Sequence, residues 1–213
     1  MLQGLLCAFL HGFIFSRVRK GVFPMDKTEL LELLADGPVI ASVKDDAGLE
    51  AAVASDVSVV FLLYGDVLNI ADLVQRAHDA GKVVFVHLDL IEGLSSREVT
   101  ADFVAKYTQA DGVLSTKVAI TRRAKELGLV AIQRFFLLDS MAISSIERQL
   151  APECSDLIEV LPGLMPKIIR RVCGVTNKPV ITGGLITDKE DVTNALSAGA
   201  VAVSTTNPDV WAM

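Results

Sequence analysis

Two short polar stretches near the C-terminus have the residue types that a phosphate site needs. Gly183 and Gly184 end one apolar run, and the next apolar run ends in Ser204, Thr205 and Thr206. Glycines let backbone N–H groups approach an anion closely, and hydroxyls donate further hydrogen bonds. A helix that begins just after the glycines would direct the positive end of its dipole at the same point. The pair predicts a site for a small phosphorylated molecule, although a tight turn and a helix cap would use the same residues.

Six charged residues lie at or just beyond the ends of other apolar runs: Lys44, Asp89, Glu92, Lys117, Arg134 and Glu159. A charge in a buried strand is costly without a partner, so these residues contact a ligand or neutralise one another. An internal ion network of Asp89, Arg134 and Glu159 is one alternative. The other is ligand contact by Asp89 with Glu92, or a divalent cation held through their oxygens. Two carboxylates alone are a weak signal for a metal.

One of these carboxylates has a histidine two residues before it. Because strand side chains alternate, we expect His87 and Asp89 to share one face of a strand, with His87 as a hydrogen-bonded core residue.

The chain contains no nucleophile elbow, zinc-ligand spacing or P-loop. Lys44 and Lys117 are candidates for Schiff-base chemistry by position only. Neither lies in the middle of an apolar strand, where desolvation would lower a lysine pKa most. No catalytic residue is therefore predicted.

Eight apolar, β-branched runs must position these residues, and amphipathic segments lie between them. The runs are Val39–Val43, Val59–Leu63, Val83–Leu90, Gly112–Leu114, Val130–Phe136, Leu157–Leu161, Val180–Thr182 and Val201–Ser204. Alternating strand and helix patterns indicate a parallel sheet, and eight units predict a single (β/α)8 barrel of the TIM type over residues 25–213. Loops must be short, and only a stub of a last helix follows Pro208. No Gly-x-Gly-x-x-Gly follows the first run, which disfavours a dinucleotide-binding fold.

Helix starts are predicted from capping patterns. Ser95 with Glu98, and Thr187 with Glu190, fit the capping box, and Asp26 is a candidate cap for a leading helix.

Composition favours one globular domain in a reducing compartment. The chain has 213 residues, of which 51% are hydrophobic, enough to bury one sizeable core. Its cysteines, Cys7, Cys154 and Cys173, form no metal-like or redox-like pair, which predicts a cytoplasmic protein. Residues 1–24 are apolar and then basic, the reverse of a secretory signal, and the apolar part is too short to span a membrane. We expect them to be an extension outside the fold, with a membrane or partner anchor as the alternative.

The barrel itself is strongly acidic. The extension has three basic and no acidic residues, so residues 25–213 have a formal net charge of −9, against −6 for the whole chain. Such a body is a poor non-specific binder of nucleic acid. Two basic patches stand out on predicted helices: Arg122 and Arg123 with Lys125, and Lys167 with Arg170 and Arg171. A solvated helix face is the usual meaning of such spacing, and a nucleic-acid contact is the alternative.

Several blocks of the sequence resemble the glycerol-3-phosphate-responsive antiterminator family. The blocks are Val86–Gly93, Gly112–Lys117, Ala131–Asp139, Ile158–Gly163, Thr182–Ile186 and Ser204–Asn207. They occur in order and at consistent spacing from about residue 37 to the end, and residues 1–24 lie outside the resemblance.

The resemblance implies a non-enzymatic regulator whose effector is glycerol 3-phosphate and which requires no other cofactor. The liganded barrel would bind the leader mRNA of a glycerol-catabolic operon and let transcription pass a terminator. By position, Gly183, Gly184, Thr205 and Thr206 would hold the phosphate. The glycerol end or the pocket wall would be shaped by Asp89, Glu92, Arg134 and Glu159.

Either one of the two basic patches would then contact RNA locally, doubled in a homodimer, or RNA binding is weak in this member. The acidic body and the lack of a base-stacking signature fit this role poorly. Two alternatives stay open: an enzyme acting on a small phosphorylated metabolite, such as an isomerase, aldolase or phosphodiesterase, and a ligand-binding barrel without an RNA role.

Overall fold

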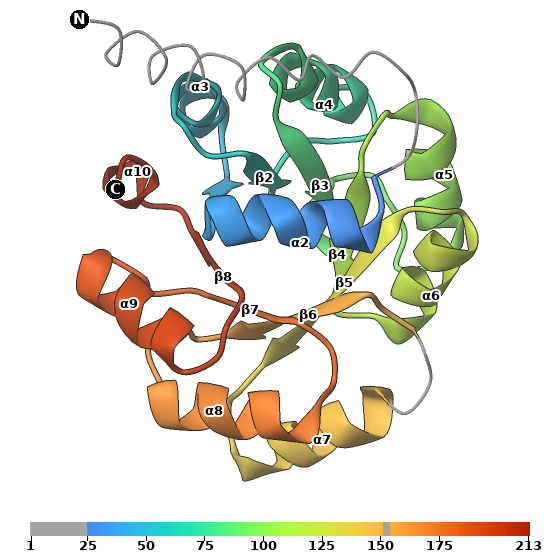
Figure 1. Cartoon of the computed structure of the whole chain (residues 1–213). Helices are drawn as coiled ribbons and strands as arrows, with labels where there is room; N and C mark the ends of the chain where they lie inside the picture. Colours follow the sequence, from blue (N-terminus) through green and yellow to red (C-terminus); the bar gives the residue numbers. More distant parts are fainter. Residues whose placement is uncertain (1–24, 151–153) are drawn as a thin grey trace, which may run out of the picture.

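The protein folds into a closed barrel of eight parallel strands in sequential order, which confirms the predicted (β/α)8 fold (Figure 1). This computed structural model describes residues 25–150 and 154–213, so the predicted extension, residues 1–24, lies outside the described residues. The strands are β1 (Val39–Val43), β2 (Val59–Leu62), β3 (Val83–His87), β4 (Gly112–Ser115), β5 (Val130–Phe136), β6 (Leu157–Leu161), β7 (Val180–Gly183) and β8 (Ala202–Thr205).

Alternate residues of each strand face the barrel axis, where apolar side chains fill the half nearer the amino ends of the strands. Phe61 and Phe85 meet there edge to face, with ring centroids 5.6 Å apart. The outward-facing residues pack against the surrounding helices. Burial on both faces explains why the strand sequences are almost continuously apolar.

Helix α2 (Lys27–Asp36) lies across the amino-terminal end of the barrel and closes it (Figure 1). Its Leu30 and Leu34 are buried in the same cluster as the apolar side chains of the barrel interior. Asp26 caps the helix by accepting hydrogen bonds from two backbone N–H groups, while Glu29 bonds back to the Asp26 N–H. The prediction of a cap at Asp26 is confirmed.

The other helices surround the barrel and cover its outer face (Figure 1). They are α3 (Asp46–Ala54), α4 (Ile70–Asp79), α5 (Val99–Tyr107), α6 (Val118–Glu126), α7 (Ser140–Leu150), α8 (Pro166–Val175), α9 (Lys189–Ser197) and α10 (Pro208–Trp211). The four-residue α10 confirms the predicted stub, and its Trp211 indole donates to the Thr205 carbonyl at 2.9 Å. Within the described ranges, no helix is long and apolar enough to cross a membrane.

The prediction for the third strand is wrong at its carboxyl end. β3 stops at His87, and Leu88–Leu90 form a turn of 3-10 helix, η1. Asp89 lies on this turn and accepts a hydrogen bond from the Thr116 N–H, which requires the chain to leave the strand direction. His87 and Asp89 therefore do not share a strand face.

Both predicted capping boxes are also wrong. Helix α5 begins only at Val99, and the Ser95 carbonyl instead accepts the Thr100 hydroxyl at 2.6 Å. At α9 the cap is Asp188, one residue later than predicted, and its carboxylate accepts the N–H of Asp191. Aspartate is a better cap than threonine, which explains the shift.

Candidate functional site

The carboxyl ends of β6, β7 and β8 bring the two predicted phosphate stretches together. Gly183 on β7 pairs with Ser204 on β8, and the Ser204 hydroxyl donates to a carboxylate oxygen of Glu159 on β6 at 2.6 Å. A Cβ on Gly183 would lie 2.1 Å from the Ser204 hydroxyl oxygen and 3.2 Å from the Glu159 carboxylate. Only glycine allows this close approach, so the predicted glycine has a structural reason.

The β7–α9 loop, residues 184–188, has an unusual backbone. Gly184 has φ +76°, and the following Leu185 has φ +64°. A left-handed leucine is unfavourable because its Cβ crowds the next carbonyl. The Leu185 side chain is 69% exposed, so its burial does not compensate for the strain. Strained backbone of this kind concentrates at ligand sites.

The hydroxyls of the β8 end are partly committed within the protein. Thr205 donates to the Ile186 carbonyl at 2.8 Å and so ties the β8 end to the β7–α9 loop. Ser204 donates to Glu159. Thr206 is exposed. Two of the three hydroxyls expected to bind a phosphate therefore donate within the protein instead. Backbone N–H groups and the Thr206 hydroxyl remain as the groups suited to an anion.

Arg134 on β5 and Glu159 on β6 form a buried ion pair. The two residues are direct neighbours in the strand register, and the Arg134 Nε lies 2.5 Å from the carboxylate. Glu159 is fully buried and Arg134 is 7% exposed. The predicted alternative of an internal ion network is thus confirmed for this pair, whereas Asp89 takes a different partner.

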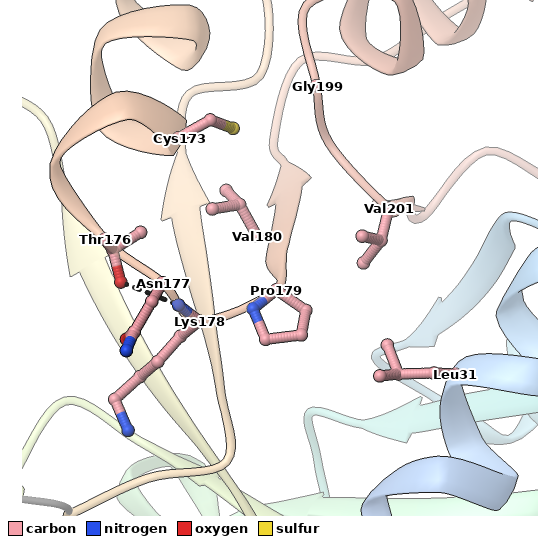
Figure 2. Close-up of a pocket in the computed structure, with 9 residues that line it drawn as sticks. All are labelled: Leu31, Cys173, Thr176, Asn177, Lys178, Pro179, Val180, Gly199 and Val201. Carbon is pink, nitrogen blue, oxygen red and sulfur yellow. Dashed lines mark hydrogen bonds between the residues drawn. The ribbon is translucent and has the colours of Figure 1, made fainter.

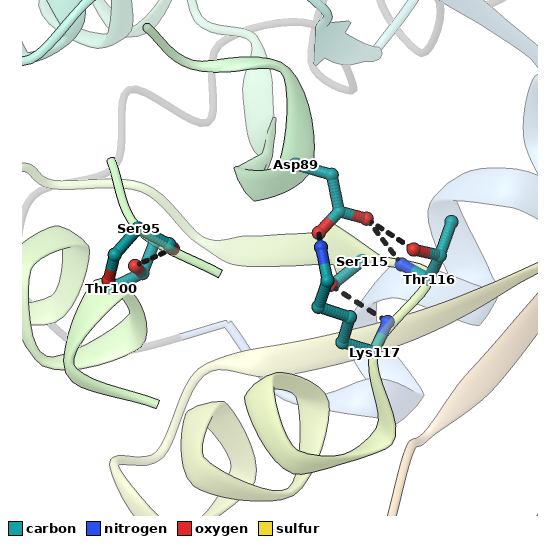
Figure 3. A network of polar contacts seen from close by, with 6 residues as sticks. All are labelled: Asp89, Ser95, Thr100, Ser115, Thr116 and Lys117. Carbon is teal, nitrogen blue, oxygen red and sulfur yellow. Dashed lines mark hydrogen bonds and ion pairs between the residues drawn. The ribbon is translucent and has the colours of Figure 1, made fainter. Parts of the chain in front are cut away.

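Asp89 is anchored to the end of β4 (Figure 3). Its carboxylate accepts hydrogen bonds from the Ser115 hydroxyl and from both the N–H and hydroxyl of Thr116, and it pairs with Lys117 at 3.2 Å. Burial alone would raise the pKa of Asp89, but these hydrogen bonds outweigh it and lower the pKa below its usual value. The carboxylate is therefore held charged and in a fixed orientation at the barrel mouth.

His87 lies on the interior face of β3 and is almost fully buried. Burial, followed by the positive charge of Arg134, lowers its pKa to about 4. The imidazole is therefore neutral at physiological pH. The Nδ1 atom of His87 has no hydrogen-bond partner in the described part of the chain. For this atom, the expectation of a hydrogen-bonded core histidine is wrong.

Two predicted site residues are exposed, unlike the buried ones of this cluster. Lys44, just after β1, is exposed. Glu92 is also exposed, and its backbone pairs with Asp66 of the β2–α4 loop. Among residues 25–150 and 154–213, no group of three or more His, Cys, Asp or Glu side chains could hold a metal. A cation at Asp89 and Glu92 stays an untested prediction.

The two basic patches differ in their pairing. On α6, Arg123 binds Asp102 and Glu126, and Lys125 binds Asp156 at 2.9 Å. Most of that patch is therefore neutralised. On α8, the corresponding residues all point to solvent: Lys167, Arg170 and Arg171.

A shallow depression of about 300 Å³ lies at the opposite end of the barrel, by the amino ends of β7 and β8 (Figure 2). Its lining is mostly apolar and includes Leu31, Pro179 and Val201. The ammonium group of Lys178 there bonds to the Ser155 carbonyl. The depression contains none of the predicted site residues.

Comparison with known proteins assigns the chain to a family. The model of the glycerol-3-phosphate responsive antiterminator family matches residues 39–211.

The chain belongs to the glycerol-3-phosphate responsive antiterminator family.

Three relatives of this antiterminator family member cover most of its length. The Escherichia coli (strain K12) uncharacterized protein YgcP is 44% identical over 184 residues, 86% of this chain and 96% of that protein. A glycerol uptake operon antiterminator regulatory protein from Listeria monocytogenes str. 4b F2365 has a TM-score of 0.80 and 31% identity, covering 83% of this chain and 95% of its own. A glycerol uptake operon antiterminator-related protein from Thermotoga maritima MSB8 has a TM-score of 0.73 and 34% identity, with coverage of 82% and 98%.

Enzymes share the fold of this antiterminator family but little of the sequence. Deoxyribose phosphate aldolase from Aeropyrum pernix is 15% identical with a TM-score of 0.64, covering 88% of this chain and 97% of its own. At such identity the likeness shows the barrel fold alone, because one fold hosts many functions.

Sequence reasoning missed two residues of this site. The left-handed Leu185 had no signal, because leucine rarely adopts that conformation. Gly163 contacts the β7–α9 loop by donating its N–H to the Gly184 carbonyl at 3.1 Å. The Pro162-Gly163 pair is a turn signal that marks a tight loop, but sequence does not tell what the loop touches.

Proposed function

We propose that this chain is a glycerol-3-phosphate-sensing transcription antiterminator that binds a leader mRNA of a glycerol-catabolic operon. The observation that carries the proposal is the junction of Gly183 with Ser204, which places the β7–α9 loop beside the β8 end in a member of this family. Loops after strands seven and eight are the usual phosphate position in a (β/α)8 barrel.

In this proposal the phosphate is bound by backbone N–H groups of Gly184 and Leu185 and by Thr206. The remaining N–H donors of the Arg134 guanidinium, beyond the one used by Glu159, lie on the wall of the same mouth. The buried Nδ1 of His87 and the fixed carboxylate of Asp89 are the groups suited to the glycerol hydroxyls. Because the His87 imidazole is neutral, it adds no positive charge that would attract a second anion to this site.

The surroundings of the two candidate lysines argue against Schiff-base chemistry and so favour a regulatory role. Lys44 is exposed to solvent, and the Lys117 ammonium donates to Asp89. Neither is a desolvated amine in the barrel interior, which is one of the environments that activate such a nucleophile.

The effector half of the proposal is tested by thermal unfolding with glycerol 3-phosphate. A ligand at a hundred times its dissociation constant should stabilise the protein by about 2.7 kcal/mol. Gly184→Val should abolish this shift, because a β-branched residue resists φ +76° and its Cβ would lie 3.3 Å from Leu161. Gly81→Val, also at positive φ but with nothing near its Cβ, is the control for backbone strain.

The RNA half is tested by binding of the operon's 5′ leader transcript with and without the ligand over a range of salt. We expect tighter binding with ligand. An RNA affinity that ignores the ligand would leave a ligand-binding barrel, and turnover of glycerol 3-phosphate or of glycerophosphodiesters would favour an enzyme.

A further inference from the structure

The outer face of α8 carries three exposed cations. Lys167, Arg170 and Arg171 are three and four residues apart and so share one face, while Ile169 and Val172 are buried on the other. None of the three cations forms an ion pair within the part of the chain that the structure describes, and α8 contains no Asp or Glu. The face therefore presents clustered positive charge to solvent.

This charge stands out against the rest of the barrel. Residues 25–213 have a formal net charge of −9, and the cations of α6 are mostly neutralised by Asp102, Glu126 and Asp156. A polyanion such as RNA is repelled by an acidic surface and needs clustered, unpaired Lys and Arg to bind. The α8 face has the charge that complements a phosphodiester backbone.

The loop that leads into α8 is packed on the β7–α9 loop. The Gly163 N–H donates to the Gly184 carbonyl at 3.1 Å. A Cβ on Gly163 would lie 2.9 Å from Ile186 and 3.0 Å from the Thr182 hydroxyl, so the two loops touch without space between them. Ile186 and Ile169 of α8 belong to the same buried cluster. The backbone that would hold a phosphate and the start of α8 thus form one packed unit.

We propose that the outer face of α8, with Lys167, Arg170 and Arg171, binds the RNA backbone, and that Gly163 links this face to the anion loop. A ligand bound at Gly184 and Leu185 would hold the strained loop in one conformation and fix the start of α8 with it. The inference rests on the proposed function, since it names the surface on which the liganded protein meets RNA.

The test compares two triple variants that lose the same charge. K167Q/R170Q/R171Q removes the α8 cations. K27Q/R97Q/K106Q removes three exposed cations from α2, the loop before α5 and α5, away from the proposed ligand loop. Binding of a labelled leader transcript is measured against KCl concentration at saturating glycerol 3-phosphate. We expect the α8 variant to lose at least tenfold in RNA affinity and its log–log salt slope to fall by about 2 to 3. The dispersed variant should stay within about twofold of wild type, and both should keep the wild-type ligand affinity and Tm.

The outcomes separate this inference from the proposed function. If wild type gains no RNA affinity from glycerol 3-phosphate, both fail. If wild type responds to the ligand but the α8 variant keeps its RNA affinity and salt slope, only the α8 surface is overturned. If poly-glutamate competes as well as RNA for the α8 face, that face is a docking site for an acidic protein, and the proposal is also overturned.

The link through Gly163 has its own matched pair. Gly163→Ala should separate the loops and reduce the factor by which glycerol 3-phosphate raises RNA affinity. Gly174 lies at the far end of α8, in its last turn, and the Cβ of Gly174→Ala would meet nothing within 4 Å, so the factor should stay as in wild type. Linkage requires RNA to raise ligand affinity by the same factor, which gives an independent measurement. An unchanged factor in Gly163→Ala would remove this loop as the connection.

Discussion

Arg134 and Glu159 form the most deeply buried ion pair described in the molecule, and removing one partner should be worse than removing both. Arg134→Met leaves the Glu159 carboxylate buried without its cation and should destabilise the fold by about 3–5 kcal/mol. The double variant Arg134→Met/Glu159→Gln removes both charges and should recover most of that loss. Urea unfolding at neutral pH measures the difference, and equal destabilisation by the single and double variants would contradict it.

His87 should make the protein sensitive to acid. Its pKa is about 4 in the fold, because of burial and the Arg134 charge, against 6.5 when unfolded. The unfolded chain therefore binds the proton first as pH falls, and stability present above pH 6.5 is lost progressively down to pH 4. The loss through this one group is about 3 kcal/mol.

The measurement is urea unfolding of wild type and His87→Gln at several pH values in that range. Asp89, whose pKa is also lowered, contributes to the acid limb of both proteins. Only the difference between the two curves reports on His87. Parallel curves would show that the imidazole is not held neutral.

The sequence predicted the strand ends that contain the site residues and offered the Arg134–Glu159 pair as one alternative, but it did not predict the partner of Asp89. The strand ends that contain Arg134, Glu159 and Ser204 follow from the apolar pattern, and neutralisation of buried charge follows from desolvation. Which cation neutralises Asp89 depends on the turn of the chain after His87, and that turn is set by a hydrogen bond across to β4. A contact between residues 27 positions apart in the sequence leaves no local pattern from which to predict it.

At the scale of single elements, the β7–α9 loop stores strain that a substitution can release. Leu185→Asn should stabilise the unliganded protein by about 1 kcal/mol, because asparagine tolerates a left-handed backbone. Leu138→Asn is the control, since Leu138 is 86% exposed and its φ is not positive. Thermal unfolding of both variants measures the effect. A Leu185→Asn protein no more stable than its control would show that the loop is unstrained.

Element boundaries show where local patterns suffice. The predicted ends of β1 and β6 agree with the structure, because Lys44 and Pro162 follow them directly. The predicted end of β5 also agrees, although apolar Leu137 follows it. The third run was overextended because Leu88 and Leu90 continue the apolar pattern into η1, although Leu90 is half exposed there. An apolar residue on a turn cannot be told from a strand residue by hydropathy alone.

For the whole molecule, α2 contributes to stability at the end of the barrel that lies opposite the proposed ligand site. Leu30→Ala leaves a cavity where the side chain is now buried and should cost about 2–5 kcal/mol. Stabilisation by glycerol 3-phosphate, at the same multiple of its dissociation constant, should be unchanged. Leu68→Ala, at a site 89% exposed, is the control and should change stability little. A change in ligand affinity in the α2 variant would contradict this separation of the two ends.

The closure of the barrel by α2 has a kinetic consequence. Leu30 and Leu34 close one end of the barrel, so the proposed effector would enter and leave at the carboxyl ends of the strands. Helix α8 begins at that same rim, directly after Met165. A transcript held along α8 would stand beside the exit, so we expect bound RNA to slow the escape of glycerol 3-phosphate. Stopped-flow dissociation with and without the transcript would then show how long the signal outlasts a fall in effector concentration.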